Sequence, residues 1–136
     1  MLPISLNKFW LAALAASLSA APAAATQWLN CANAAQGVDV GLLLGTAGGF
    51  GATGAIMRQE DHNWSTDPAY GAGTPFTIGQ GFSDSSGMKV DFYDEIVNDL
   101  VAELRLVRGA EGDDVVLAGM LRIVGIGVWP VTCDWE

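Results

Sequence analysis

The side chains that could catalyse a reaction are few, and they gather around one histidine. His62 is the only imidazole and no cysteine is expected to be free, so H-E-x-x-H and Cys-His arrangements fail, and a Ser-His-Asp triad would need His62 to meet Ser65 and an aspartate. Glu60 and Asp61 precede His62, but neighbours in a strand point to opposite faces and would not share a site. We therefore predict no catalytic residues and no enzyme activity, with a small hydrolase using His62 as one alternative.

Two cysteines, Cys31 and Cys133, lie near opposite ends of the chain and are predicted to form a disulfide. In a small exported domain, two thiols indicate one bridge. Closing a loop of about 100 residues stabilises a fold by ~4.7 kcal/mol in the chain-entropy model. A metal site would need more imidazole or thiolate ligands than one histidine supplies, so no metal site is predicted.

The first 25 residues have the layout of a secretory signal peptide. Lys8 precedes an apolar run from Phe9 to Leu18, and the small-residue segment Ser19 to Ala25 follows. A run of about 10 apolar residues cannot cross a ~30 Å hydrocarbon core, which favours a cleaved leader over an anchor. Cleavage before Thr26 would leave a single domain, residues 26–136, in the periplasm or outside the cell.

Net charge limits the partners of that domain. Without Lys8 the chain has five Lys or Arg against 15 Asp or Glu, a formal net charge of −10. Phosphate backbones would be repelled, so nucleic-acid binding is not expected. The 111 residues after the leader are too few for at least eight spanning strands of about 9–11 residues each, so no membrane span is predicted there. A cationic protein is a permitted partner, although a solvated surface is the usual reason for such an excess of acidic residues.

Alternation of apolar and polar residues predicts short strands throughout the domain. The last of them contains Pro130, which lacks an N–H, so this strand should be an edge strand or be paired on one side only at that residue. Seven to nine strands with short connections indicate an all-β fold, a mostly antiparallel barrel or sandwich whose first and last strands are joined by the disulfide. The expected strands are 27–32, 38–44, 55–60, 64–66, 76–83, 88–93, from about 100, 115–124 and 129–133.

The clearest hairpin surrounds the Asp84–Gly87 turn. Phe76, Ile78 and Phe82 are predicted to share one face before it, and residues 88–93 alternate after it. Aspartates flank the turn, but the spacing of a calcium loop is absent, so a solvated turn is expected.

The segment that begins at Asp94 fits two patterns. Apolar residues from Ile96 onward fit a helical face with Asp94 as N-cap, and we predict a helical turn at 94–99 followed by a strand from about Leu100. Residues 109–114 read as a loop. Gly125 and Gly127 are expected to bend or bulge a strand.

Gly49, Gly51 and Gly54 match G-x-G-x-x-G, the glycine pattern of dinucleotide-binding folds. In those folds the motif follows a strand directly and opens a helix. Here only Ala55 to Glu60 remain before a turn expected at 61–63, and this segment is too short for that helix. We predict a flexible glycine loop and no cofactor.

The longest predicted loop, Asp67 to Pro75, carries Tyr70 and lies close in sequence to His62 and Trp64. Loops of this length often carry binding function, and aromatic side chains offer large contact area. We predict a ligand surface formed by His62, Trp64 and Tyr70. The alternatives are a plain surface connection and a Trp64 that serves the core.

A small exported β domain with its ends joined by a disulfide resembles the periplasmic inhibitors of C-type lysozyme. The resemblance rests on Trp28-x-x-Cys31 and Cys133. The Ser-Gly-Tyr loop and the Trp-Lys-Gly segment of those inhibitors are absent here, so no functional residues carry over. We therefore predict a periplasmic or secreted, non-catalytic module that binds an unknown ligand or is associated with the cell envelope. The alternative that the resemblance implies is an inhibitor of a lysozyme-like cationic enzyme.

Overall fold

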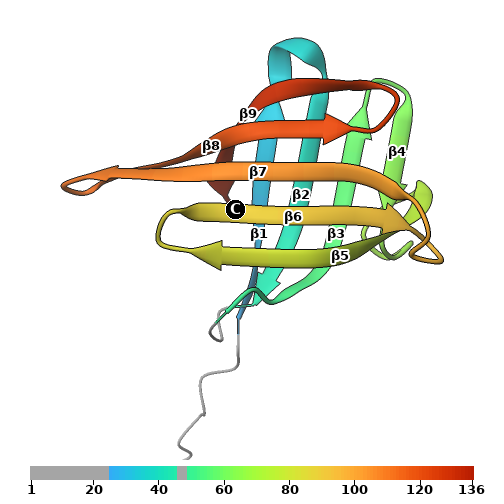
Figure 1. Ribbon diagram of the computed structural model, residues 1–136, viewed down its shortest axis with the longest axis horizontal. Coiled ribbons are helices and arrows are strands. Elements are labelled where there is room, and N and C mark those ends of the chain that lie inside the picture. The colour runs from blue at the N-terminus through green and yellow to red at the C-terminus, as the bar shows by residue number, and fades with distance from the viewer. Residues whose placement is uncertain (1–24, 46–48) are drawn as a thin grey trace, which may run out of the picture.

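The computed structural model describes residues 25–45 and 49–136, which form a closed barrel of nine strands (Figure 1). Sequence neighbours pair antiparallel, except for the parallel pair β4 and β5. The predicted all-β, mostly antiparallel barrel is confirmed, whereas the predicted leader lies outside the described residues but for Ala25. The elements are β1 (Thr26–Asn33), η1 (Ala34–Gln36, a 3-10 helix), β2 (Val38–Gly45), β3 (Ala52–Gln59), β4 (His62–Ser65), β5 (Thr74–Asp84), β6 (Gly87–Asp94), β7 (Leu100–Glu111), β8 (Asp114–Ile123) and β9 (Gly127–Trp135).

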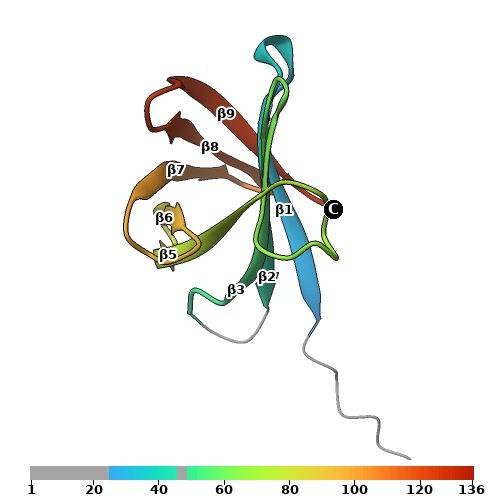
Figure 2. The same ribbon diagram turned by 90° about the vertical axis from the view of Figure 1, so that its right-hand side faces the viewer.

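The barrel is flattened into two layers whose strands cross steeply. Strands β1 to β4 run across the direction of β5 to β8, and the core lies between the two groups (Figures 1 and 2). Within the core, the rings of Phe76 and Phe92 stack with their centroids 5.2 Å apart. The predicted alternation is confirmed in β2, where every second residue from Val38 to Leu44 is buried. The buried apolar residues are Leu29, Cys31, Val38, Val40, Leu42, Leu44, Ala55, Met57, Phe76, Met88, Val90, Phe92, Ala102, Leu104, Leu106, Leu121, Ile123 and Val131.

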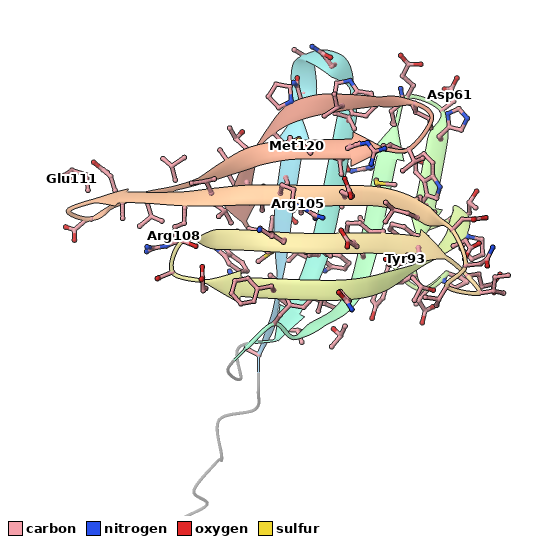
Figure 3. All side chains as sticks on the ribbon, in the orientation of Figure 1. Asp61, Tyr93, Arg105, Arg108, Glu111 and Met120 are labelled. Carbon is pink, nitrogen blue, oxygen red and sulfur yellow. A yellow bond between two sulfur atoms is a disulfide. The ribbon has the colours of Figure 1, made fainter. Side chains whose placement is uncertain are left out.

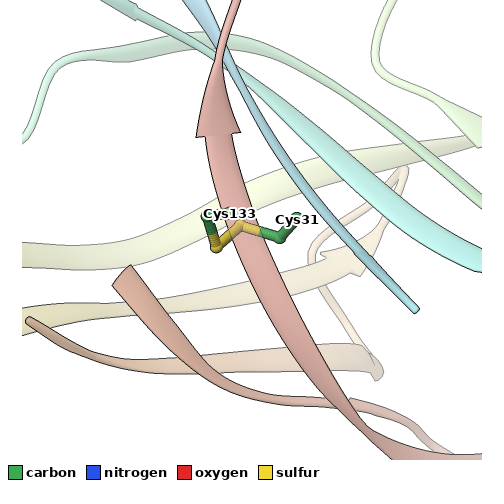
Figure 4. Close-up of a disulfide and its surroundings, with 2 residues drawn as sticks. All are labelled: Cys31 and Cys133. Carbon is green, nitrogen blue, oxygen red and sulfur yellow. A yellow bond between two sulfur atoms is a disulfide. The ribbon is translucent and has the colours of Figure 1, made fainter. Parts of the chain in front are cut away.

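Strands β1 and β9 close the barrel, and the predicted disulfide joins them (Figure 4). Cys31 and Cys133 lie directly opposite each other, with their Cα atoms 3.9 Å apart. The β1–β9 ladder ends at Thr132, so Pro130 pairs with β8 alone, as its missing N–H predicts. On the other side, the Asn33 side-chain amide donates to the Pro130 carbonyl over 3.0 Å.

The predicted shared face of Phe76, Ile78 and Phe82 is wrong for Phe82. The β5–β6 register shifts between Ile78 and Gly81, because an extra residue reverses the alternation of side chains beyond that point. Phe82 therefore faces outward and is 57% exposed. A Cβ on Gly81 would overlap the ring of Phe50, which packs against the core from the segment before β3.

Residues 94–99 form a tight turn, not the predicted helical turn. The Asn98 N–H donates to the Asp94 carboxylate over 2.7 Å, and Val97 has a left-handed backbone with φ 57°. The apolar residues that suggested a helical face are exposed here, Ile96 by 79%. The strand from Leu100 is confirmed.

Two glycine-containing segments are hairpin turns where the sequence predicted other structures. The predicted 109–114 loop is wrong: β7 continues to Glu111, β8 begins at Asp114, and Gly112 turns between them with φ 58°. Gly125, expected in a bulge, has φ 78° in the turn between β8 and β9. Left-handed φ values favour glycine at both positions.

The predicted Asp84–Gly87 turn is confirmed. The Asp84 carboxylate accepts hydrogen bonds from the Ser86 hydroxyl (2.6 Å) and the Ser86 N–H (2.7 Å). These bonds hold the pKa of Asp84 below its ordinary value. None of the described residues belongs to a helix long and apolar enough to span a membrane.

Candidate functional site

His62 and Trp64 lie on β4, on the side of the sheet that faces the core. The turn before them is Glu60–Asp61, so the predictions of a strand through Glu60 and of a turn that includes His62 are wrong. Trp64 pairs with buried Met57 and packs against the core while staying half-buried. His62 is exposed and stacks on Trp64, with ring centroids 5.9 Å apart. Asp61, which precedes His62, is labelled in Figure 3 and marks the end of the molecule where His62 lies.

Tyr70 lies on the opposite, outer side of the sheet. The loop between β4 and β5 carries its ring over Gly54, where a Cβ would overlap the ring. There Tyr70 meets Trp28 of β1 edge-on, with centroids 5.5 Å apart and an interplanar angle of 83°. The structure thus brings Tyr70 to Trp28 and not to Trp64. A binding role for His62, Trp64 and Tyr70 stays a prediction.

His62 and Ser65 do not meet. They are three positions apart on β4, so their side chains point to opposite faces. Ser65 is 5% exposed, and its hydroxyl donates to the carbonyl oxygen of Asp67 over 2.6 Å. The contacts that a Ser-His-Asp triad requires are therefore not made by these residues.

A hollow of about 510 Å³ lies on the outer face of β1, β2 and β3. We call it the aromatic hollow. It is lined by Trp28, Asn30, Ala32, Asp39, Ile56, Arg58, Ala69, Tyr70 and Glu136.

Strand register arranges this lining in three successive rows across the sheet. Trp28 lies in line with Leu43 and Gly54, under Tyr70. The middle row places Asn30, Gly41 and Ile56 side by side, and the last row places Ala32, Asp39 and Arg58. The hollow therefore runs from an aromatic end to a charged end.

Gly41 allows the middle of the hollow to be deep. A Cβ at Gly41 would lie 2.9 Å from the Asn30 side-chain oxygen, 3.2 Å from Ile56 and 3.3 Å from the Trp28 ring. Because the glycine has no side chain, these three groups converge over bare backbone.

The charged end holds one ion pair. The Arg58 Nε lies 3.1 Å from the Asp39 carboxylate, and the two side chains are 61% and 31% exposed. Such an exposed pair adds little stability, typically ~0–1 kcal/mol. Its planar polar groups remain open to a ligand, as does the half-buried Asn30 amide.

Trp28, Asn30, Asp39 and Arg58 were missed by sequence reasoning. Trp28 and Asn30 alternate with buried Leu29 and Cys31, so their outward direction was predictable. A tryptophan on the outward side of a strand was the available signal. The meeting of three strands in rows depends on register, which alternation alone does not set.

The glycine motif leads into a strand. Gly54 lies inside β3, and no helix follows Gly49 and Gly51, so the nucleotide-binding arrangement is not formed there.

No protein family model, curated protein or solved structure matches this chain. The resemblance to lysozyme inhibitors gains no support from a match. Functional inference therefore rests on the geometry described above.

Proposed function

We propose that the protein is an exported, non-catalytic binding module that holds its ligand in the aromatic hollow. The observation that carries this proposal is the edge-on pair of Trp28 and Tyr70 over Gly54, on the outer face of the barrel. Tyr70 is 36% exposed although its ring already packs on Trp28. Aromatic side chains beside a few convergent polar groups are typical of small-molecule sites.

The chemistry of the lining favours a neutral saccharide. A sugar ring has an apolar face of C–H groups, which packs against an aromatic ring, and hydroxyl groups at its edge. The Trp28 and Tyr70 rings supply the first contact, and Asn30, Asp39 and Arg58 supply donors and acceptors for the hydroxyls. Asp39 and Arg58 neutralise each other and Glu136 adds a negative charge to the lining, so an uncharged ligand suits this hollow better than a phosphate or a polyanion.

Export is supported by two independent observations. The first 25 residues have the pattern of a leader, and the Cys31–Cys133 disulfide is compatible with an oxidising compartment. Protein purified from the producing cell should begin at Thr26, or within a residue or two of it. Amino-terminal sequencing that finds Met1 retained would contradict export.

A panel of short neutral oligosaccharides of glucose, galactose and N-acetylglucosamine tests the ligand class. Mature protein should bind at least one member in isothermal titration, and Trp28→Ala should remove that binding. Trp135→Ala is the control, because Trp135 is an exposed tryptophan that lies outside the hollow. Failure of every oligosaccharide to bind would overturn the saccharide proposal.

Inhibition of a cationic glycosidase remains the second candidate. Its support is the formal net charge of −10 after leader removal, which would attract a basic enzyme. Mature protein should then inhibit a C-type lysozyme in a cell-wall lysis assay, with weaker inhibition at high salt. Full lysis at a large excess of the protein would remove this candidate.

A further inference from the structure

Residues 107–116 extend beyond the barrel as a two-stranded ribbon, which we call the projecting hairpin (Figures 1 and 3). Strand β7 pairs with β6 only as far as Val107, and β8 pairs with β9 only from Leu117 onward. Beyond those points the two strands pair with each other alone, up to Glu111 and Asp114. Both outer edges of the ribbon are therefore open.

The hairpin exposes valines on both of its faces. Val107 and Val116 share one face and are 70% and 60% exposed, and Val115 on the other face is 55% exposed. Natural sheets blunt their open edges with lysine, proline or bulges. Residues 107–116 contain neither lysine nor proline, and their β7–β8 register is unbroken. Exposed apolar edges of this kind indicate an interaction surface.

One edge of the hairpin presents unpaired backbone groups. The Arg108 N–H donates away from β8, to the Ser86 carbonyl over 2.8 Å. Backbone N–H and carbonyl groups two residues apart in a strand point to the same side of that strand. The Ala110 N–H and carbonyl therefore also point away from β8, into the space past the end of β6. An added strand at Ala110 would prolong the line of β6.

An apolar hollow of about 250 Å³ lies beneath this edge, on the inner face of the hairpin. Met88, Val115, Leu117 and Trp135 provide its apolar lining, and Asp84 and Arg108 lie at its polar positions. Trp135 is 55% exposed there. Alternate side chains of a strand added at Ala110 would point into this hollow.

The charges around the hairpin are mostly negative. Glu111, Asp113 and Asp114 surround its tip, and none of them forms an ion pair with a described residue. Figure 3 shows Glu111 at the far end of the ribbon. A second copy of this acidic chain would bring like charges together, whereas a basic segment complements them.

We propose that the projecting hairpin binds an extended basic segment of a partner protein as an added strand beside Ala110, with one apolar side chain of that segment in the hollow under Val115. The surface is separate from the aromatic hollow, so this proposal stands independently of saccharide binding. Backbone pairing would supply affinity, and the hollow and the acidic tip would supply selectivity.

The probe is a short acetylated peptide in which lysine alternates with leucine, titrated into the mature protein and followed by NMR at Ala110, Val115 and Trp135. Ala110→Pro removes the open N–H without breaking the β7–β8 ladder, and Val115→Lys fills the hollow with a charged chain. Each should weaken binding at least about tenfold. Val128→Lys is the control. Val128 is similarly exposed (58%) but lies at the end of β9 away from Trp135, so this variant should leave peptide binding unchanged.

The control peptide replaces every lysine with glutamate and should not bind. Equal binding of both peptides, no binding of the lysine peptide, or wild-type affinity in Val115→Lys would overturn the proposal. Sedimentation that reveals a dimer lost in Ala110→Pro would assign the edge to self-association and would overturn it as well. Circular dichroism identifies unfolded variants, and if Ala110→Pro unfolds, Val115→Lys decides alone.

Discussion

Two aromatic pairs lie against the sheet of the first four strands, on its opposite faces. His62 and Trp64 are two positions apart on β4, stack with centroids 5.9 Å apart, and lie on the side of the core. Trp28 and Tyr70 come from β1 and a distant loop, meet edge-on at 5.5 Å, and lie on the outer side. Sequence proximity produced the first pair, whereas the second exists only once β1, β2 and β3 have paired and the loop after β4 lies over them.

The difference shows which pair is arranged for a ligand. Trp64 packs against the core, so much of its contact area already serves the fold. Trp28 and Tyr70 instead stand over glycines, beside a row of polar side chains in a hollow of about 510 Å³. The outer pair can therefore be changed with less effect on stability than the inner pair.

The largest effect should come from loss of the disulfide, which acts on both pairs alike. Cys133→Ser, or reduction, should lower the free energy of unfolding by about 2–5 kcal/mol, because the bridge no longer constrains the unfolded chain. Urea denaturation of oxidised and reduced protein measures this. An unchanged midpoint would mean that packing alone holds the ends of the barrel together.

Trp64→Ala should show that the inner pair contributes to stability through its tryptophan. Removing a half-buried tryptophan should cost about 2 kcal/mol, less than the ~3–5 kcal/mol of a fully buried one. His62→Ala is the matched change in the exposed partner and should stay within about 0.5 kcal/mol of wild type. If Trp64→Ala is as stable as His62→Ala, the inner pair does not serve the core.

Gly54→Ala should displace Tyr70 without altering its side chain. The new Cβ would overlap the Tyr70 ring, which can swing away at small cost to the fold. We expect saccharide affinity to fall about tenfold, by ~1.4 kcal/mol. Gly51→Ala, where a Cβ meets nothing within 4 Å, is the control. Equal affinities of the two variants would show that the position of Tyr70 is irrelevant to binding.

Much of the barrel was predictable, because burial on one face imposes alternation. Val38, Val40, Leu42 and Leu44 are buried as their spacing predicts, and Cys31 meets Cys133 as the only possible disulfide within the chain. The bulge after Ile78 was not predicted: Gly79, Gln80 and Gly81 interrupt the apolar alternation there, but this pattern does not show that an extra residue reverses the direction of the later side chains.

The projecting hairpin and the aromatic hollow were hidden for two further reasons. Residues 109–114 are exposed on both faces, so no alternation of burial could identify them as strand. Trp28 and Tyr70 are 42 positions apart and meet through register and a loop conformation. Alternation predicts which way a side chain points, but not which distant strand it will lie beside.

Isothermal titration of one oligosaccharide from the neutral panel into four proteins tests the central claim most directly. Wild type and His62→Ala should bind with equal affinity, whereas Trp28→Ala and Tyr70→Ala should each lose at least ~1 kcal/mol of binding free energy while keeping their stability. Loss of affinity in His62→Ala, with wild-type affinity in the Trp28 and Tyr70 variants, would place the ligand at the inner pair and contradict this account.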